Sequence, residues 1–198
     1  MQPRPGPQLI QGREVANLLR TAVAVNPLNA LRYKCHACED WHEGLPSPGW
    51  DYPLPYLGVP EAERGVRIKL TTDTCVIDGR EFFVRANLPI HIHQADQDLS
   101  WGVWVSLSGQ SFRRFQTLFG DEGRVPGESF FGWFCVTVPG YPDTQLLKTR
   151  IHIQPWPERP LVELEPTGHP LAVDYREGIT VARALELVRP FVARAEGG

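Results

Sequence analysis

"FFVRANLPIHIH", residues 82–93, places an apolar side chain at every second position along most of its length. Alternation of this kind is typical of a β-strand with one face against a core and the other toward solvent. Three further segments repeat the pattern, at residues 66–70, 101–108 and 147–154. The sequence therefore predicts a mostly antiparallel sheet with one apolar and one wet face.

Two helices are predicted to cover the apolar face, which makes the fold class α+β. Ser108 is suited to cap the first helix, and Thr180 is suited to cap the second. Each helix carries an apolar stripe at helical spacing. The stripes consist of Phe112, Phe115 and Phe119 in the first helix, and of Ala184, Leu185 and Val188 in the second.

The length of 198 residues, with 42% hydrophobic and 22% charged residues, fits one domain with a substantial core. We expect an N-terminal extension with one amphipathic helix (1–32), a single α+β domain (33–192) and a flexible tail (193–198). No apolar run approaches the ~20 residues that span a membrane, and the first residues lack an apolar signal-peptide centre. The expected location is therefore the cytoplasm.

The segment "YKCHACEDWHEG", residues 33–44, suggests a zinc site. Two cysteines separated by two residues can direct both thiolates at one ion, and a nearby histidine can supply a third ligand. We expect a closed, structural zinc site in a knuckle-like loop followed by a proline-rich stretch. Its ligands would be Cys35, Cys38, His42 and Cys75, with Cys135 as the alternative fourth ligand. A redox pair, Cys35 and Cys38, and ordinary unliganded side chains are the other interpretations.

The outward positions of the predicted strands are rich in basic and histidine side chains. If these strands are neighbours, one sheet face is cationic although the net charge of the chain is −3. A flat cationic surface that carries a tryptophan suits an anionic partner, while the plain alternative is a solvated face that Glu163 and Glu165 partly neutralise. The candidate partner-binding residues are Arg85, His91, His93, Trp104, Arg150 and His152.

No common catalytic motif is present in the sequence. We therefore expect a non-enzymatic binding protein whose partner is a protein or a small anionic ligand. The net charge does not favour nucleic acid. The alternative is a metal-dependent hydrolase that uses His91, His93 and His152 with a carboxylate.

Several segments together resemble the bacterial domain-of-unknown-function 2199 family, over roughly residues 33–188. They are "CHACEDWHEGLP", "DTCVID", "FFVRANLPI", "WGVWVSLS", "PGYPDT", "LLKT" and "RPLVELEPTGHPLAV". The resemblance implies a small bacterial cytoplasmic protein, and the family itself supplies no biochemical role.

The family pattern of a cysteine knuckle ending in Trp-His, followed later by Asp-x-Cys, is matched in this chain. The matching positions are Cys35, Cys38, Trp41, His42, Asp73 and Cys75. The family commonly has glycine after the second cysteine, where this chain has Glu39. If that position requires a positive φ, Glu39 is strained there by about 1 kcal/mol.

Overall fold

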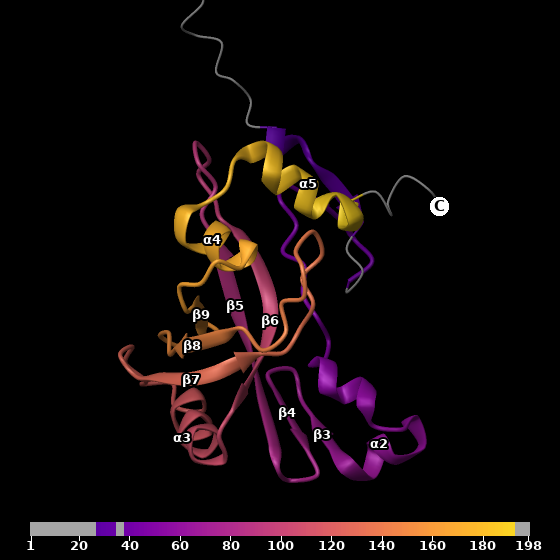
Figure 1. Cartoon of the computed structure of the whole chain (residues 1–198), viewed down its shortest axis with the longest axis vertical. Coiled ribbons are helices and arrows are strands. Elements are labelled where there is room, and N and C mark those ends of the chain that lie inside the picture. Colours follow the sequence, from indigo (N-terminus) through magenta and orange to yellow (C-terminus); the bar gives the residue numbers. More distant parts are fainter. Residues whose placement is uncertain (1–26, 35–37, 193–198) are drawn as a thin grey trace, which may run out of the picture.

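The computed structural model describes residues 27–34 and 38–192, which form helices and strands in the order shown in Figure 1. The predicted N-terminal helix and the predicted tail lie outside these residues. The helical elements are η1 (Pro27–Ala30), η2 (Leu54–Gly58), α2 (Glu61–Arg67), α3 (Gly109–Phe119), α4 (Pro170–Glu177) and α5 (Val181–Val192). The strands are β1 (Arg32–Lys34), β2 (Trp41–Glu43), β3 (Ile68–Leu70), β4 (Thr74–Ile77), β5 (Glu81–Ile90), β6 (Leu99–Leu107), β7 (Ser129–Phe134), β8 (Lys148–His152) and β9 (Leu161–Leu164).

Seven of the strands form one sheet in the order β3-β4-β5-β6-β7-β8-β9, and each pairs antiparallel with the next. β5 also pairs in parallel with β9 at Asn87 and Leu161, and the Asn87 amide donates to the Pro160 carbonyl at 2.8 Å. This contact closes β5 to β9 into a five-stranded barrel. The α+β class and the mostly antiparallel pairing are confirmed, but the closure of the sheet into a barrel was not expected.

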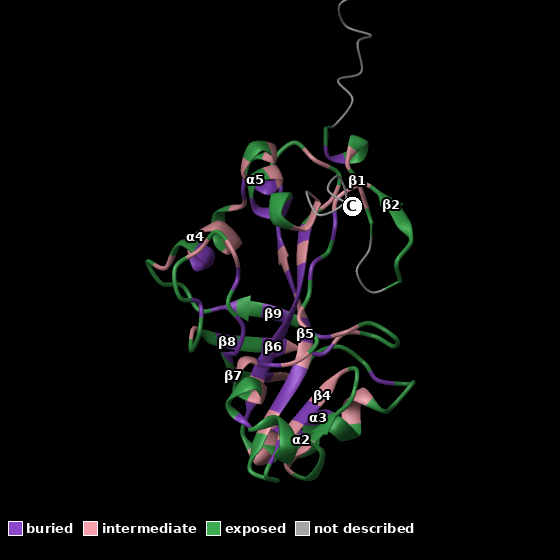
Figure 2. Cartoon of the chain, turned by 90° about the vertical axis from the view of Figure 1, so that its right-hand side faces the viewer, coloured by how far each residue is buried: buried purple, intermediate pink, exposed green. Residues whose placement is uncertain are grey.

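The interior of the barrel explains the alternation in the sequence. Side chains at every second position of β5 to β9 point inward and are buried, and packing of such side chains is the main stabilising term of the fold. The inward set includes Val84, Ala86, Val103, Val105, Phe130, Phe134, Thr149, Ile151, Val162 and Leu164. Figure 2 shows this burial along the long strands β5 and β6.

The helices do not lie together on one face, so that part of the prediction is wrong. Figure 1 places α3 at one end of the barrel and α4 with α5 at the other end, with α2 beside β3. Both predicted caps are confirmed. The Ser108 hydroxyl accepts from the Ser111 amide at 3.1 Å, and the Thr180 hydroxyl accepts from the Arg183 amide at 3.2 Å.

The proline-rich stretch after β2 is an ordered irregular segment that contains η2, as the prolines predicted. Val66, expected at the start of a strand, instead lies in α2, and β3 begins at Ile68. α2 buries none of its side chains, so it has no apolar stripe from which a helix could be predicted. Among the described residues, no helix combines the length and the hydropathy needed to cross a membrane.

Candidate functional site

The outer face of strands β6 to β9 arranges side chains by chemical class, strand by strand. Ser106 on β6 lies opposite Trp133 on β7, which lies opposite Lys148 on β8. At the next outward position, two residues along each strand, Phe131 lies opposite Arg150. Arg150 in turn lies opposite Glu163 on β9. Directly opposed side chains on one sheet face are close neighbours. The result is a surface with an aromatic, a basic and an acidic row side by side, here called the open face.

The aromatic row consists of two large side chains that the fold leaves in solvent. Phe131 is 41% exposed and Trp133 is 38% exposed. Their ring centroids lie 5.2 Å apart in an edge-to-face arrangement, which is a favourable geometry for an aromatic pair. Beside them is a depression of about 450 Å³ lined by Phe131, Gly132, Trp133 and the end of β6 with the start of α3. Exposed apolar surface next to a depression marks a binding site more often than an ordinary surface.

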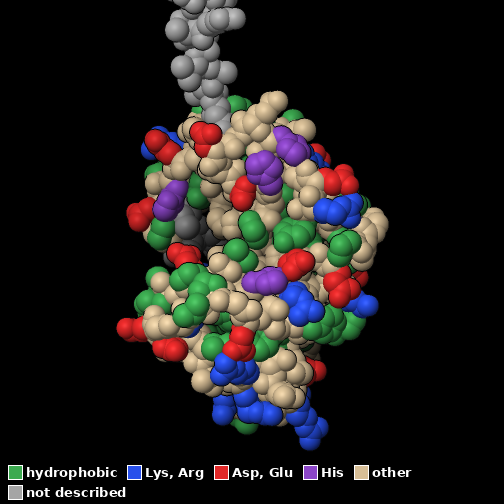
Figure 3. Space-filling model, turned by 90° about the vertical axis from the view of Figure 1, so that its left-hand side faces the viewer, with side chains coloured by type: hydrophobic (Ala, Val, Ile, Leu, Met, Phe, Trp, Pro, Cys, Tyr) green, Lys and Arg blue, Asp and Glu red, His purple; other side chains and the backbone are tan. Residues whose placement is uncertain are grey.

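The basic row is only partly neutralised by the acidic row. The imidazole of His152 lies 2.6 Å from the Glu163 carboxylate, and the Lys148 ammonium lies 3.9 Å from the Glu165 carboxylate. The Arg150 guanidinium has no carboxylate partner among the described residues, and its side-chain hydrogen bond goes to the Ser129 hydroxyl at 3.4 Å. Figure 3, which views the side where β8 and β9 lie, shows histidines beside acidic side chains. Arg150 is therefore the basic group of this row that remains available to a partner.

Trp104 belongs to the same outer face but is completely buried, so the expectation that it is exposed to solvent is wrong. The alternation predicted its side of the sheet correctly, since it lies opposite Arg85 and points away from the barrel interior. The proline-rich segment covers it there. The Trp104 indole donates to the Trp50 carbonyl at 2.8 Å, and the Leu54 amide donates to the Cys135 carbonyl at 2.8 Å.

Arg85 lies under the same segment and is half-buried. A Cβ atom built on Gly49 would come within 2.9 Å of its guanidinium, so the loop backbone passes directly over it. Burial lowers the pKa of Arg85, with a smaller contribution from the charge of Arg159. The structure thus separates Arg85 and Trp104, which are covered, from Arg150 and His152, which are on the open face.

His91 and His93 form a pair of their own at the end of β5. Their rings are 5.5 Å apart, and the His91 imidazole lies 3.2 Å from the Asp98 carboxylate. Both residues exchange backbone hydrogen bonds with Ile179, next to α4 and α5. Within residues 27–34 and 38–192, no three His, Cys, Asp or Glu side chains are placed to hold a metal ion. The histidine set of a metal-dependent hydrolase is therefore not assembled in this part of the chain.

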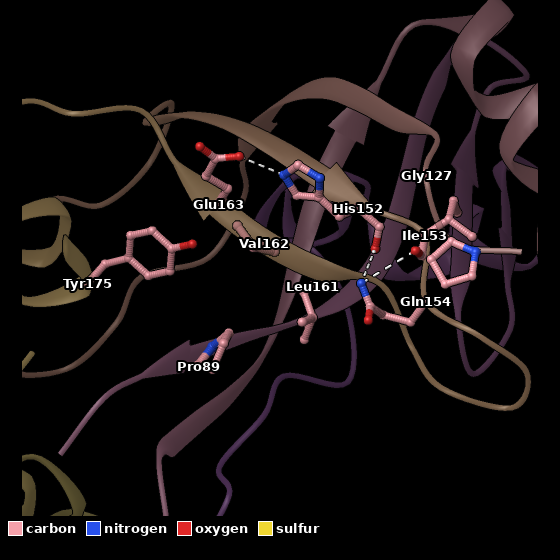
Figure 4. A pocket seen from close by; sticks show the side chains of 10 residues that line it. Pro89, Gly127, His152, Ile153, Gln154, Leu161, Val162, Glu163 and Tyr175 are labelled. Carbon is pink, nitrogen blue, oxygen red and sulfur yellow. Dashed lines mark hydrogen bonds and ion pairs between the residues drawn. The ribbon is translucent and has the colours of Figure 1, made fainter.

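His152 and Glu163 also line a second depression, of about 380 Å³, where β9 meets β5 (Figure 4). Tyr175 of α4 lines it as well, and burial together with the charge of Glu163 raises the pKa of its phenol. A histidine oriented by a carboxylate can act as a general base. However, the described residues that line this depression include no serine, threonine or cysteine for it to activate.

The expected zinc ligands are brought together only in part. In the β1–β2 hairpin, the Cys38 sulfur lies 3.1 Å from the His42 Nε2 atom, while Cys35 lies outside the described residues. Cys75 is completely buried in β4, which Figures 1 and 2 place at the opposite end of the molecule from this hairpin. Burial raises the pKa of the Cys75 thiol to about 11, and burial also raises the pKa of Cys135. These two side chains therefore remain protonated thiols in this packing.

Sequence reasoning missed Phe131 and Trp133. The strand "SFFGWF" carries aromatic side chains on both faces and glycine at one inward position, so its polarity does not alternate. The signal that could have identified them was the position of "FFGWF" between two turn-rich segments.

The fold and the site together define a small α+β protein built on a closed five-stranded barrel, with a candidate binding surface on its outside. A family described as "Uncharacterized protein conserved in bacteria (DUF2199)" matches residues 34–179, and the chain belongs to this family. No curated protein and no solved structure matches the chain.

Proposed function

We propose that this protein is a non-enzymatic binding protein that engages its partner through the open face. The observation that carries the proposal is the exposed Phe131–Trp133 pair beside Arg150. Aromatic side chains and arginine are the residue types that most often dominate binding energy at interfaces. An anionic group on the partner would meet Arg150, whose guanidinium has no carboxylate partner among the described residues.

The test is co-purification of the full chain from the native bacterium, comparing wild type with the double variant Phe131→Ala/Trp133→Ala. Trp41→Ala is the matched control, because Trp41 is 51% exposed but lies on β2, outside the open face. We expect a partner that wild type and the Trp41 variant retain and the double variant loses, while the double variant remains folded with a melting temperature only a few degrees lower. A partner retained equally by all three proteins would contradict the proposal.

We also propose that Cys38 and His42, with Cys35, supply three of the four ligands of a structural zinc ion at the hairpin. The support is the 3.1 Å approach of the Cys38 sulfur to His42, since thiolate and imidazole are the preferred zinc ligands. Metal analysis of the purified protein would then show zinc that Cys38→Ser loses and Cys75→Ser keeps. Full zinc occupancy in the Cys38 variant would exclude this site.

Glu39 bears on the same hairpin, because its φ is +60°, in the left-handed region. Glu39 therefore has the backbone strain that was expected if a non-glycine residue occupied this position, where the family commonly has glycine. Glu39→Gly should stabilise the hairpin by about 1 kcal/mol, because glycine adopts this conformation without a Cβ clash. Thermal unfolding monitored with and without a chelator would measure the gain. A loss of stability would mean that interactions of the Glu39 side chain stabilise the hairpin by more than its strained backbone destabilises it.

A further inference from the structure

We infer that the ligand of the open face is a small nucleotide, held by stacking of its base on Phe131 and Trp133 and by contact of its phosphate with Arg150. This inference rests on the proposed function and specifies the partner chemistry. It follows from three features that the strand register brings together: exposed aromatic rings, a hydroxyl-lined depression and a basic group without a carboxylate partner.

The aromatic row offers π surfaces at a spacing set by the strand. Phe131 and Trp133 are two residues apart on β7, so both rings project from the same side of the sheet. Their edge-to-face geometry, with ring planes at 82°, leaves ring surface in solvent on both side chains. Any base can stack on an exposed aromatic ring, because every base has a π face.

Next to the rings, on the β6 side, the depression of about 450 Å³ is lined by three serines. Its volume falls within the range of small-molecule sites, which combine apolar walls with a few polar groups. Ser106, Ser108 and Ser111 supply hydroxyl groups that can exchange hydrogen bonds with base edges or a ribose. The Ser108 hydroxyl donates to the Ser111 oxygen at 3.0 Å, which leaves the Ser111 proton available to a ligand.

On the other side of the rings, β8 provides the positive charge. Arg150 lies directly opposite Phe131, and Lys148 lies directly opposite Trp133. The Lys148 ammonium is only loosely paired, at 3.9 Å from Glu165. Arginine binds phosphate oxygens with two parallel hydrogen bonds when no carboxylate competes for its donors. A ligand stacked on β7 would therefore have its phosphate within reach of β8.

The acidic row limits the length of the ligand. Glu163 on β9 and Glu165 directly after β9 lie immediately beyond the basic row, and the chain as a whole carries a net charge of −3. Successive phosphates that continue across the face would approach these carboxylates and be repelled. A mononucleotide places its one phosphate on Arg150, at the edge of the acidic row, and has no further phosphates that would have to pass Glu163 and Glu165. The charge pattern thus favours a small nucleotide over a long strand.

The test uses nuclear magnetic resonance of the ¹⁵N-labelled full chain, which has six tryptophan indole signals. The Trp133 signal is assigned from the Trp133→Phe variant, and the Trp41 signal serves as an internal control. The probes are adenosine 5′-monophosphate, adenosine, inorganic phosphate and an oligodeoxyadenylate of about eight nucleotides. We expect the monophosphate to shift the Trp133 signal in a saturable way without shifting that of Trp41. Adenosine should bind about tenfold more weakly.

Arg150→Ala should reduce the affinity for the monophosphate to that for adenosine, while the control Arg80→Ala should leave it unchanged. Arg80 is also exposed but lies in the turn between β4 and β5. Three results would overturn the inference: no shift at millimolar nucleotide, an equal shift with inorganic phosphate alone, or an oligonucleotide that binds much more tightly than the monophosphate. A protein partner lost only in the Phe131/Trp133 double variant would still support the proposed function in each case.

Discussion

The two halves of the outer sheet face differ in what lies over them. Over β5 and β6 the proline-rich segment packs against the sheet, and Trp104 beneath it is completely buried. Over β7 and β8 no described segment covers the aromatic row, and Trp133 is 38% exposed. Figure 2 shows the contrast between buried positions on β5 and β6 and exposed positions on β8 and β9. Two tryptophans on the same face of one sheet thus have opposite environments.

This contrast teaches that side-chain alternation assigns a side of a sheet but not its environment. Trp104 and Trp133 both point away from the barrel interior, and only the path of a loop distant in sequence distinguishes them. A covered tryptophan contributes to stability through its packing. An exposed tryptophan contributes little to stability and is available for binding.

The largest expected effect comes from comparing Trp104→Ala with Trp133→Ala. Removal of the buried indole should lower the free energy of unfolding by about 3–5 kcal/mol, because it leaves a cavity and an unpaired Trp50 carbonyl. Removal of the partly exposed indole should cost less, about 1–2 kcal/mol, because 38% of its surface is already in water and no closed cavity is left. Urea denaturation measures both values. Equal losses of unfolding free energy would mean that Trp104 and Trp133 do not differ in how far they are buried.

Gly49→Ala tests the contact between the covering loop and the sheet. The new Cβ would lie 2.9 Å from the Arg85 guanidinium and 3.2 Å from the Gly102 carbonyl oxygen, so the guanidinium would have to shift and the backbone would have to yield by a few tenths of an ångström. We expect a loss of about 1–3 kcal/mol, typical of overpacking, in thermal or urea unfolding. Gly58→Ala is the matched control on the same segment, because nothing lies within 4 Å of its Cβ. A Gly49 variant as stable as the control would show that the proline-rich segment is not closely packed against the sheet at this point.

Alkaline pH should destabilise the folded protein through Cys75, which is completely buried in β4. Burial raises the pKa of its thiol from 9.0 to about 11. Between these pH values the unfolded chain releases the proton while the folded chain retains it, so stability is lost as pH rises from about 9 to 11. Urea midpoints measured across this range should fall, and Cys75→Ala should show a smaller fall relative to its own value at neutral pH. An identical pH dependence in both proteins would mean that this thiol is not buried.

The smallest effect on stability is expected for Arg150→Ala on the open face. Its guanidinium has no carboxylate partner within the described chain, so the free energy of unfolding should change by no more than about 0.5 kcal/mol. The affinity for the partner should nevertheless fall by about tenfold. A variant whose melting temperature falls by many degrees would assign Arg150 to the structural part of the sheet.

Much of the architecture follows from sequence patterns that depend on near neighbours. The strands around Val84, Val103 and Ile151 alternate in polarity, and the helix caps Ser108 and Thr180 precede apolar stripes, so both were predictable. The outward positions of Lys148 and Arg150 followed from the same alternation.

The features that sequence could not supply depend on contacts between distant segments. Closure of the barrel requires β5 to meet β9 at Asn87 and Leu161, and burial of Trp104 requires the loop that contains Trp50. Cys75 was expected beside Cys38 as the fourth ligand of a zinc site, whereas strand pairing places it opposite Phe83. Alternation therefore predicted which side of the sheet Arg150 and Trp104 occupy, but not that Trp104 is buried there.

The most direct measurement of the difference between the two halves is hydroxyl-radical footprinting of the native protein, read out by mass spectrometry of each tryptophan and phenylalanine. If the loop covers one half and leaves the other open, Phe131 and Trp133 are oxidised readily while Trp104 stays unmodified until the protein is unfolded. Oxidation of Trp104 at the rate of Trp133 in the folded protein would contradict the account.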